Sequence, residues 1–215
     1  MDKGKFISFL LEFGVVQFGE FLTKSGRVTP YFINTGKFDD SRKLSTVGEF
    51  YAKVINDNFG DATLIFGPAY KGIPLSVVTA MKLYEIYGKN VKVAFNRKEA
   101  KDHGEGGSIV GEISENDRIV IVEDVITSGL SIRESINIIR SVGNSRVLGV
   151  VVSVDRMELG NRGKLAKVEI EEDFDIRVFS VVTILDILNF IKSGGFVSLD
   201  VVKKIEDYIS TYKKF

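Results

Sequence analysis

Residues 119–131 read Ile-Val-Ile-Val-Glu-Asp-Val-Ile-Thr-Ser-Gly-Leu-Ser, an apolar run followed by two adjacent carboxylates and a turn of small, hydroxyl-bearing residues. The uninterrupted apolar run predicts a strand, Ile119 to Val122, that is buried on both faces of a parallel sheet. Groups that follow such a strand lie at the carboxyl edge of the sheet, where α/β proteins bind their ligands. The stretch therefore predicts both the fold class and the position of the functional site.

The two carboxylates and the turn after them suit different parts of a ligand. Glu123 and Asp124 can accept hydrogen bonds from hydroxyl groups, and once the chain turns both can approach one sugar diol. Thr127 to Ser131 supply hydroxyl and backbone N–H groups ahead of a helix, where the helix dipole favours an anion. A diol receptor beside a phosphate receptor indicates a site for a ribose 5-phosphate group. The simpler alternative is a strand-to-helix loop with a polar tip.

The residues after the turn predict a helix. Ser131 and Glu134 have the spacing of a capping box, and Ile132, Ile136 and Ile139 recur at helical spacing. We therefore expect the turn to lead directly into a helix N-terminus.

The chain alternates helices and strands from about residue 44 onward, which predicts a parallel sheet with helices on both faces. The segment Asn96 to Gly107 is rich in charge and lacks apolar periodicity, so it predicts a mobile loop. The residues before Pro30 predict only a short helix around Phe6 to Phe13 and a polar turn. The expected helices are 44–58, 73–87, 183–192 and one opened by Ser198, and the expected strands are 62–66, 91–95, 119–122, 147–154 and 178–182.

The composition limits the class of protein. A chain of 215 residues is long enough for one α/β domain, 1–215. Lys plus Arg and Asp plus Glu number 29 each, so no net charge favours nucleic acid or an anionic membrane as a partner. No stretch approaches the roughly 20 apolar residues that span a bilayer. The absence of cysteine excludes disulfides and thiolate chemistry and fits a cytoplasmic location.

Two further segments offer cations to a phosphorylated ligand. Gly67-Pro-Ala-Tyr-Lys-Gly72 follows a predicted strand, and Lys71 within it suits a pyrophosphate, although alone this would be an ordinary turn with a surface lysine. The charged segment could close over the ligand as a lid, but its acidic residues make a solvated loop the simpler alternative. The basic residues of this segment are Arg97, Lys98, Lys101 and His103.

Two more segments could contact a planar, anionic group. Phe32 could stack on a base and Lys24 could pair with an anionic substituent, while a core strand with a polar entry is the alternative. Arg156 follows the predicted strand 147–154 and suits a carboxylate, although it could instead form a surface pair with Asp155.

Five motifs in this order resemble bacterial-type orotate phosphoribosyltransferases. They are Lys-Ser-Gly-Arg-x-Thr-Pro-Tyr-Phe from Lys24, Gly-Pro-Ala-Tyr-Lys-Gly-Ile-Pro from Gly67, Asn-Arg-Lys-x-x-Lys-x-His-Gly-Glu-Gly from Asn96, the stretch 119–131, and Asp-Arg-x-Glu from Asp155. The stretch 119–131 resembles the phosphoribosyl pyrophosphate (PRPP) signature of all type I phosphoribosyltransferases. The first and third motifs resemble the orotate branch.

The resemblance implies a type I phosphoribosyltransferase fold, with a core of about residues 41–215 and a small hood mainly from about residues 1–40. It implies transfer of the 5-phosphoribosyl group from PRPP to orotate, with Mg²⁺ held largely by substrate and water, no dedicated metal-binding residue, and a homodimer. The implied PRPP-binding residues are Tyr70, Lys71, Arg97, Lys98, Lys101, His103, Glu123, Asp124, Val125, Ile126, Thr127, Ser128, Gly129, Leu130 and Ser131. Of these, Lys71, Lys101, Glu123 and Asp124 are the implied catalytic residues. The implied orotate-binding residues are Lys24, Phe32, Ile33, Thr127 and Arg156.

The sequence departs from the family pattern at two positions. Ile33 replaces an aromatic residue often found after Phe32, and Leu159 replaces a common basic residue near Arg156. Two other functions stay open at this point. One is a PRPP-sensing regulator without catalytic activity, and the other is a phosphoribosyltransferase for a purine base or uracil.

Overall fold

The computed structural model describes residues 2–22, 26, 28–101 and 107–212, and its centre is a six-stranded sheet in the order β5-β4-β3-β6-β7-β8. All neighbouring strands are parallel except β4 and β5, which are antiparallel. The mostly parallel sheet confirms the predicted α/β class. The strands are β3 (Leu64–Phe66), β4 (Lys92–Lys101), β5 (Gly107–Val110), β6 (Arg118–Ile126), β7 (Arg146–Asp155) and β8 (Arg177–Thr183).

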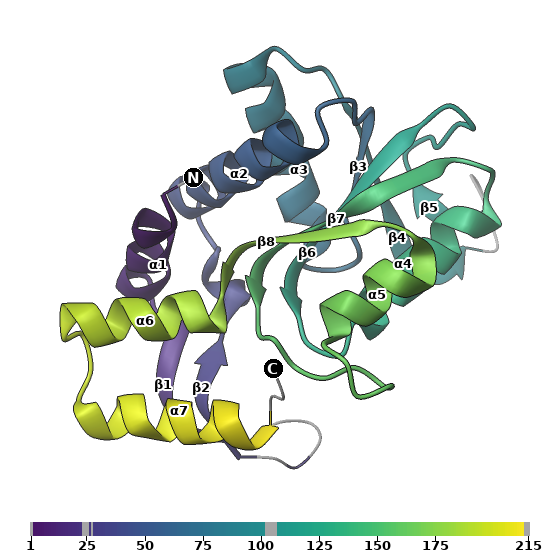
Figure 1. Cartoon of the computed structure of the whole chain (residues 1–215). Coiled ribbons are helices and arrows are strands. Elements are labelled where there is room, and N and C mark those ends of the chain that lie inside the picture. The colour runs from purple at the N-terminus through teal and green to yellow at the C-terminus, as the bar shows by residue number, and fades with distance from the viewer. Residues whose placement is uncertain (1, 23–25, 27, 102–106, 213–215) are drawn as a thin grey trace.

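Helices cover both faces of this sheet (Figure 1). One face packs on α2 (Ser41–Asn58) and α3 (Gly72–Tyr87), and the other packs on α4 (Leu130–Ser141) and α5 (Ala166–Phe174). The side chains of β6 alternate between the two cores: Val120 and Val122 join the first, and Ile119 and Ile121 join the second. Their full burial confirms that the apolar run is a strand covered on both faces.

The hood contains α1 (Lys3–Glu12), the antiparallel hairpin β1 (Val16–Leu22) and β2 (Val28–Ile33), and the short 3₁₀ helix η1 (Thr35–Lys37). Two C-terminal helices, α6 (Ile184–Gly194) and α7 (Leu199–Tyr212), lie beside α1 and the hairpin (Figure 1). Thr183 caps α6 in a capping box with Asp186. The layer around the hood therefore draws on both ends of the chain.

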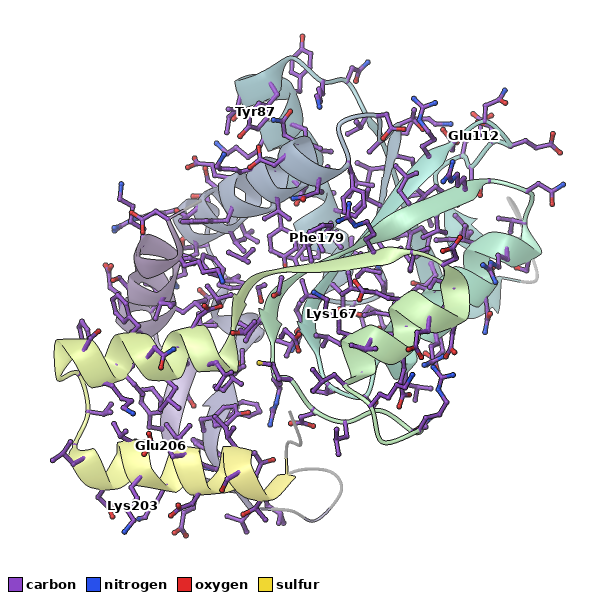
Figure 2. All side chains as sticks on the ribbon, viewed as in Figure 1. Tyr87, Glu112, Lys167, Phe179, Lys203 and Glu206 are labelled. Atoms are coloured by element: carbon purple, nitrogen blue, oxygen red, sulfur yellow. The ribbon has the colours of Figure 1, made fainter. Side chains whose placement is uncertain are left out.

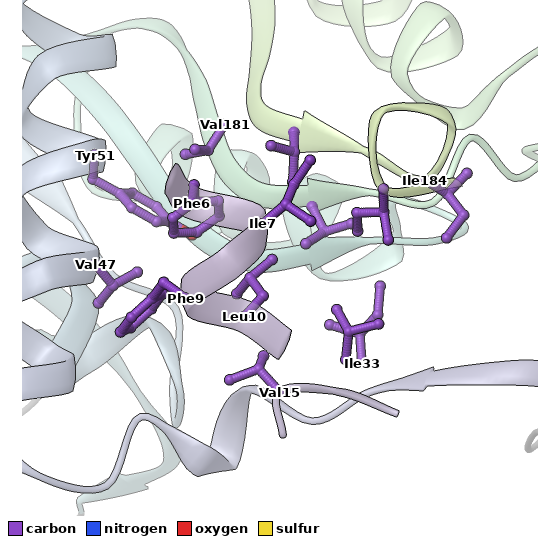
Figure 3. Close-up of a cluster of buried hydrophobic side chains, with 14 of the residues drawn as sticks. Phe6, Ile7, Phe9, Leu10, Val15, Ile33, Val47, Tyr51, Val181 and Ile184 are labelled. Atoms are coloured by element: carbon purple, nitrogen blue, oxygen red, sulfur yellow. The ribbon is translucent and has the colours of Figure 1, made fainter. Parts of the chain in front are cut away.

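Hood and sheet share one hydrophobic core. Figure 3 shows Phe6, Phe9 and Leu10 of α1 filling the space between α2, β8 and the start of α6, with Ile33 of β2 in the same cluster. Figure 2 shows Phe179 of β8 among the side chains between the sheet and α2, where its ring meets Phe59 edge-on at 5.5 Å. This shared core fixes the hood against the carboxyl end of the sheet.

Two predicted strand boundaries are wrong. The loop expected from Asn96 is instead strand up to Lys101, because β5 pairs with it at Asn96 and at Lys101, with an irregular register between these two residues. Residues 102–106 lie outside the described part of the chain. The strand expected to end at Val122 continues to Ile126, because β7 pairs with it as far as Asp155. Three elements, β1, β5 and α5, were not predicted from the sequence. In the described part of the chain, no helix is long and apolar enough to cross a membrane.

Candidate active site

Asp124 is the centre of a contact between three separate segments at the carboxyl end of the sheet. Its Oδ2 accepts hydrogen bonds from the Lys71 ammonium, at 3.0 Å, and from the Thr35 hydroxyl. The Lys71 Nζ also lies 3.0 Å from Thr35 Oγ1. Lys71 directly precedes α3 and Thr35 lies in η1, so hood, helix and sheet meet at this carboxylate. Its Oδ1 accepts from the backbone N–H of Val125 at 2.8 Å.

Glu123 leaves the strand on the opposite face, because β6 is still extended here. Its Oε2 accepts from the hydroxyl of Ser131, and its Oε1 accepts from the backbone N–H of Asp124 at 3.0 Å. The side chain is only 7% exposed. Burial, together with the nearby charge of Asp124, raises the pKa of Glu123 to about 7. The hydrogen bond from Ser131 lowers this pKa, but its effect is smaller.

Two buried hydroxyl groups hold the backbone of this acidic pair, and the sequence analysis missed both. Tyr51 of α2 donates to the carbonyl of Glu123 at 2.7 Å, and Ser153 of β7 donates to the carbonyl of Asp124. Both side chains are completely buried. Ser153 interrupts the apolar run 147–154 of β7, and a single polar residue within such a run indicates a buried hydrogen bond.

The turn after β6 leads into α4 without a side-chain cap. Gly129 is the residue before the helix, at φ 78°, and a Cβ there would lie 2.5 Å from the Cδ1 of Ile170. The predicted capping box is wrong, because the Ser131 hydroxyl bonds to Glu123 instead of the helix backbone. Thr127 and Ser128 are exposed, so their hydroxyl groups and the N-terminus of α4 are open to solvent.

The loop after β3 packs closely on itself and is joined to β4. A Cβ on Gly67 would lie 2.1 Å from the carbonyl oxygen of Gly72, so only glycine fits there. The side-chain oxygen of Asn96, a residue that the analysis of the sequence gave no role, accepts from the N–H of Ala69 at 2.8 Å. The peptide bond between Ala69 and Tyr70 is cis.

A groove lies between this loop, β4 and α4. Tyr70 is 69% exposed, and the Lys98 ammonium lies 5.0 Å from the centre of its ring. The structure thus brings two of the predicted PRPP-binding residues into contact. The groove is lined by Pro68, Ala69, Asn96, Arg97, Lys98, Ser131, Glu134, Ser135, Asn137 and Ile138.

The predicted orotate-binding residues differ in exposure. Phe32 is 40% exposed and packs on Phe21, whereas the side chain of Ile33 is buried in the shared core (Figure 3). Arg156 is not part of an exposed pair: it is buried, forms an ion pair with Glu158 at 2.8 Å, and lies 5.0 Å over the ring of Tyr31. Lys24, His103 and the side chain of Lys101 lie outside the part of the chain that the structure describes.

Glu123 and Asp124 are two adjacent carboxylates at this rim that could bind a divalent cation. Within residues 2–22, 26, 28–101 and 107–212, no group of three or more His, Cys, Asp or Glu side chains could hold a metal ion. A divalent cation here would therefore take most of its ligands from substrate and water.

Comparisons with known proteins agree with this geometry. Residues 35–187 match the family model of the phosphoribosyl transferase domain. The orotate phosphoribosyltransferase of Clostridium acetobutylicum is 46% identical over 217 residues, covering 99% of this chain and 96% of that protein. That of Thioalkalivibrio sulfidiphilus is 44% identical over 211 residues, covering 98% and 97%. The crystal structure of the Francisella tularensis orotate phosphoribosyltransferase superposes with a TM-score of 0.84 at 34% identity, covering 98% of this chain and all of that one. The chain belongs to the orotate phosphoribosyltransferase family.

Proposed function

We propose that the rim around Asp124 transfers the 5-phosphoribosyl group of PRPP to orotate, giving orotidine 5-monophosphate and pyrophosphate. As a member of this family the chain is a phosphoribosyltransferase of pyrimidine biosynthesis. The observation that carries the assignment of the site is the contact of Asp124 with Lys71, at 3.0 Å, close to the open N-terminus of α4. This arrangement supports the assignment of Asp124 to the sugar, of Lys71 to the leaving group and of the helix N-terminus to the phosphate.

The 5-phosphate binds to the turn Thr127 to Ser131 in this proposal. The turn is exposed at Thr127 and Ser128, and it opens directly onto the N-terminus of α4. Unpaired backbone N–H groups and the helix dipole both favour an anion at this place. Val125, Ile126 and Leu130 border the phosphate and ribose through their backbone.

Glu123 and Asp124 act on the ribose. As pyrophosphate leaves the anomeric carbon, positive charge develops on the sugar, and nearby carboxylates stabilise that charge. Tyr51 and Ser153 hold the carbonyl groups of the two residues, so the carboxylates are positioned before substrate arrives. No nucleophilic side chain is needed, because orotate supplies a ring nitrogen as the nucleophile.

Lys71 and Tyr70 contact the leaving pyrophosphate, and Arg97 and Lys98 lie at the groove beside them. Lys101 and His103 complete the cationic lid by resemblance to the family. Their charges neutralise the leaving group and lower the barrier to its departure.

Orotate binds between the hood and the end of β7. Phe32 offers an exposed ring for stacking. The resemblance assigns the guanidinium of Arg156, which is buried and paired with Glu158, to the orotate carboxylate. Lys24 and Thr127 are assigned to the same subsite by resemblance, and Ile33 contributes through its backbone because its side chain is buried.

Mg²⁺ is the proposed metal cofactor, and the donor set fits it. It commonly binds through one or two carboxylates together with substrate phosphates, and Glu123 and Asp124 are such carboxylates. When bound, the ion would neutralise part of the charge of the pyrophosphate.

We further propose a homodimer and a cytoplasmic location. Three exposed side chains form an apolar stripe along α3: Val77, Met81 and Tyr84, which are 40%, 55% and 64% exposed. Their spacing places them on one helix face, and such a stripe is typical of a surface that a second copy covers. The lack of cysteine is compatible with a reducing compartment.

The decisive experiment mixes the purified protein with Mg²⁺, PRPP and orotate and follows the loss of orotate absorbance together with pyrophosphate release. We expect both, with hypoxanthine and uracil turned over far more slowly in parallel reactions. A preference for either of those bases would show that this base, and not orotate, is the substrate. Retention on DNA at physiological salt, without release of pyrophosphate, would instead favour a regulator.

A further inference from the structure

Thr35 lies at the centre of the site although none of the five sequence motifs contains it. The residue belongs to η1, which joins the hood to α2, and its side chain is buried, at 5% exposed. The backbone of η1 is fixed by hydrogen bonds from Lys37 to Asn34, at 3.1 Å, and from Phe38 to Thr35, at 3.0 Å. Thr35 therefore presents its hydroxyl group from a rigid turn.

The direction of each hydrogen bond follows from the chemistry of the partners. An ammonium group only donates, an ionised carboxylate only accepts, and a hydroxyl group has one proton to give. Lys71 must therefore donate to the Thr35 oxygen, and Thr35 must give its proton to Asp124. The hydroxyl group links the cation and the acid, which also contact each other directly.

We propose that Thr35 is a positioning residue that keeps Asp124 in place while Lys71 changes partner. This inference rests on the proposed function, in which Lys71 contacts the pyrophosphate of PRPP. Without ligand, the Lys71 ammonium is held by Asp124 and Thr35. When pyrophosphate draws that ammonium away, Asp124 loses its cation but keeps the hydrogen bond from Thr35, and so stays oriented toward the ribose.

Packing alone does not fix Asp124. A cavity of ≈ 110 Å³ lies beside it, large enough to hold water, and gives both Asp124 and Lys71 space to move. Without the hydroxyl group and the ammonium, Oδ2 would lose the hydrogen bonds from both groups, and the carboxylate would be able to pivot into this space about the bond that Oδ1 accepts from Val125. The cavity is lined by Thr35, Gly36, Phe38, Leu44, Lys71, Pro74, Leu75 and Asp124.

The test compares Thr35→Val, which removes the hydroxyl group but keeps the shape, with Thr35→Ser, which keeps the hydroxyl group. We expect Thr35→Val to lower kcat/KM for PRPP roughly tenfold, the scale of losing one hydrogen bond to a charged group. The KM for orotate should change less than about twofold, and Thr35→Ser should recover most of the loss. Calorimetric titration with PRPP and Mg²⁺, without orotate, should show weaker binding by Thr35→Val.

Thr79→Val is the matched control. Thr79 is also completely buried, in α3, and its hydroxyl group has no hydrogen-bond partner within the described part of the chain. This variant should bind and use PRPP like the parent. Equal kinetics of Thr35→Val and the parent, or equal impairment of the Val and Ser variants, would overturn the inference. A parent protein that binds PRPP but does not react with orotate would refute the proposed function alone, and the calorimetric comparison would still decide the role of Thr35.

Discussion

Glu123→Gln should change how the stability of the protein depends on pH. The Glu123 carboxyl is buried and close to Asp124, and its pKa is raised from 4.5 to about 7 in the folded chain. Glutamine has nearly the same shape but carries no titratable proton. The substitution therefore removes the ionisation of this one buried group with little change in packing.

The sign and size of the effect follow from proton binding. Between pH 4.5 and about 7 the folded chain holds a proton on Glu123 that the unfolded chain has released, so the free energy of unfolding falls as pH rises through this window. The difference between the folded and unfolded pKa values corresponds to a loss on the order of 3 kcal/mol in the free energy of unfolding, and this loss is complete above pH 7. Below pH 4.5 both states are protonated and this contribution to stability is fully present.

Urea unfolding of the parent and Glu123→Gln at pH 5 and pH 8 measures this contribution. From pH 5 to pH 8, the free energy of unfolding of the parent should fall by on the order of 3 kcal/mol relative to that of the variant. Asp117→Asn is the control. Burial alone would raise the pKa of Asp117, but hydrogen bonds from Lys92, Ser114 and Thr63 outweigh this effect and hold the pKa at about 2. Asp117 is ionised at both pH values, so its variant should differ from the parent by the same amount at each. A parent–Glu123→Gln difference that does not vary with pH would refute the reasoning.

Three further predictions test the site, its support and the assembly. Asp124→Asn or Lys101→Ala should lower turnover at least tenfold, about 1.4 kcal/mol in barrier, with an unchanged circular dichroism spectrum, and full turnover in both variants would contradict the assigned roles. Tyr51→Phe should reduce the free energy of unfolding by about 1–3 kcal/mol, because the buried carbonyl of Glu123 loses its donor, and an unchanged urea midpoint would show that this bond contributes nothing. Met81→Asp should convert a dimer into monomers in light scattering, and a monomeric parent would rule the dimer out.

The sheet and the position of the site were predictable because their signals are local. The apolar run 119–122 and the polar residues after it contain both the strand and the candidate site at its carboxyl end, and the glycine residues around Lys71 mark the second loop of the same rim. The alternation of helices and strands along the chain then predicted that the strands of the core are parallel. These patterns depend only on neighbouring residues, so they could be read without the fold.

The contacts that complete the site depend on residues far apart in the sequence. Thr35 and Asp124 are 89 positions apart, and no local pattern marks a single threonine as a partner of a distant carboxylate. The spacing of Ser131 and Glu134 predicted a helix cap, yet the hydroxyl group of Ser131 donates its hydrogen bond to the carboxylate of Glu123 instead. The charged segment after Asn96 was predicted as a loop because its polar side chains lack the apolar pattern of a strand. It forms a strand because it pairs with β5.

The C-terminal helix has a consequence for the order in which the protein matures. Tyr208 of α7 meets the ring of Tyr31 edge-on at 5.9 Å, and Tyr31 lies beneath Arg156 at the end of β7. While the ribosome is still producing residues before 199, the surroundings of this arginine are unfinished, however complete the sheet is. We therefore expect a nascent chain to acquire its affinity for orotate only after residues 199–212 have been synthesised, and a chain truncated after Ser198 should bind PRPP but not orotate in calorimetry.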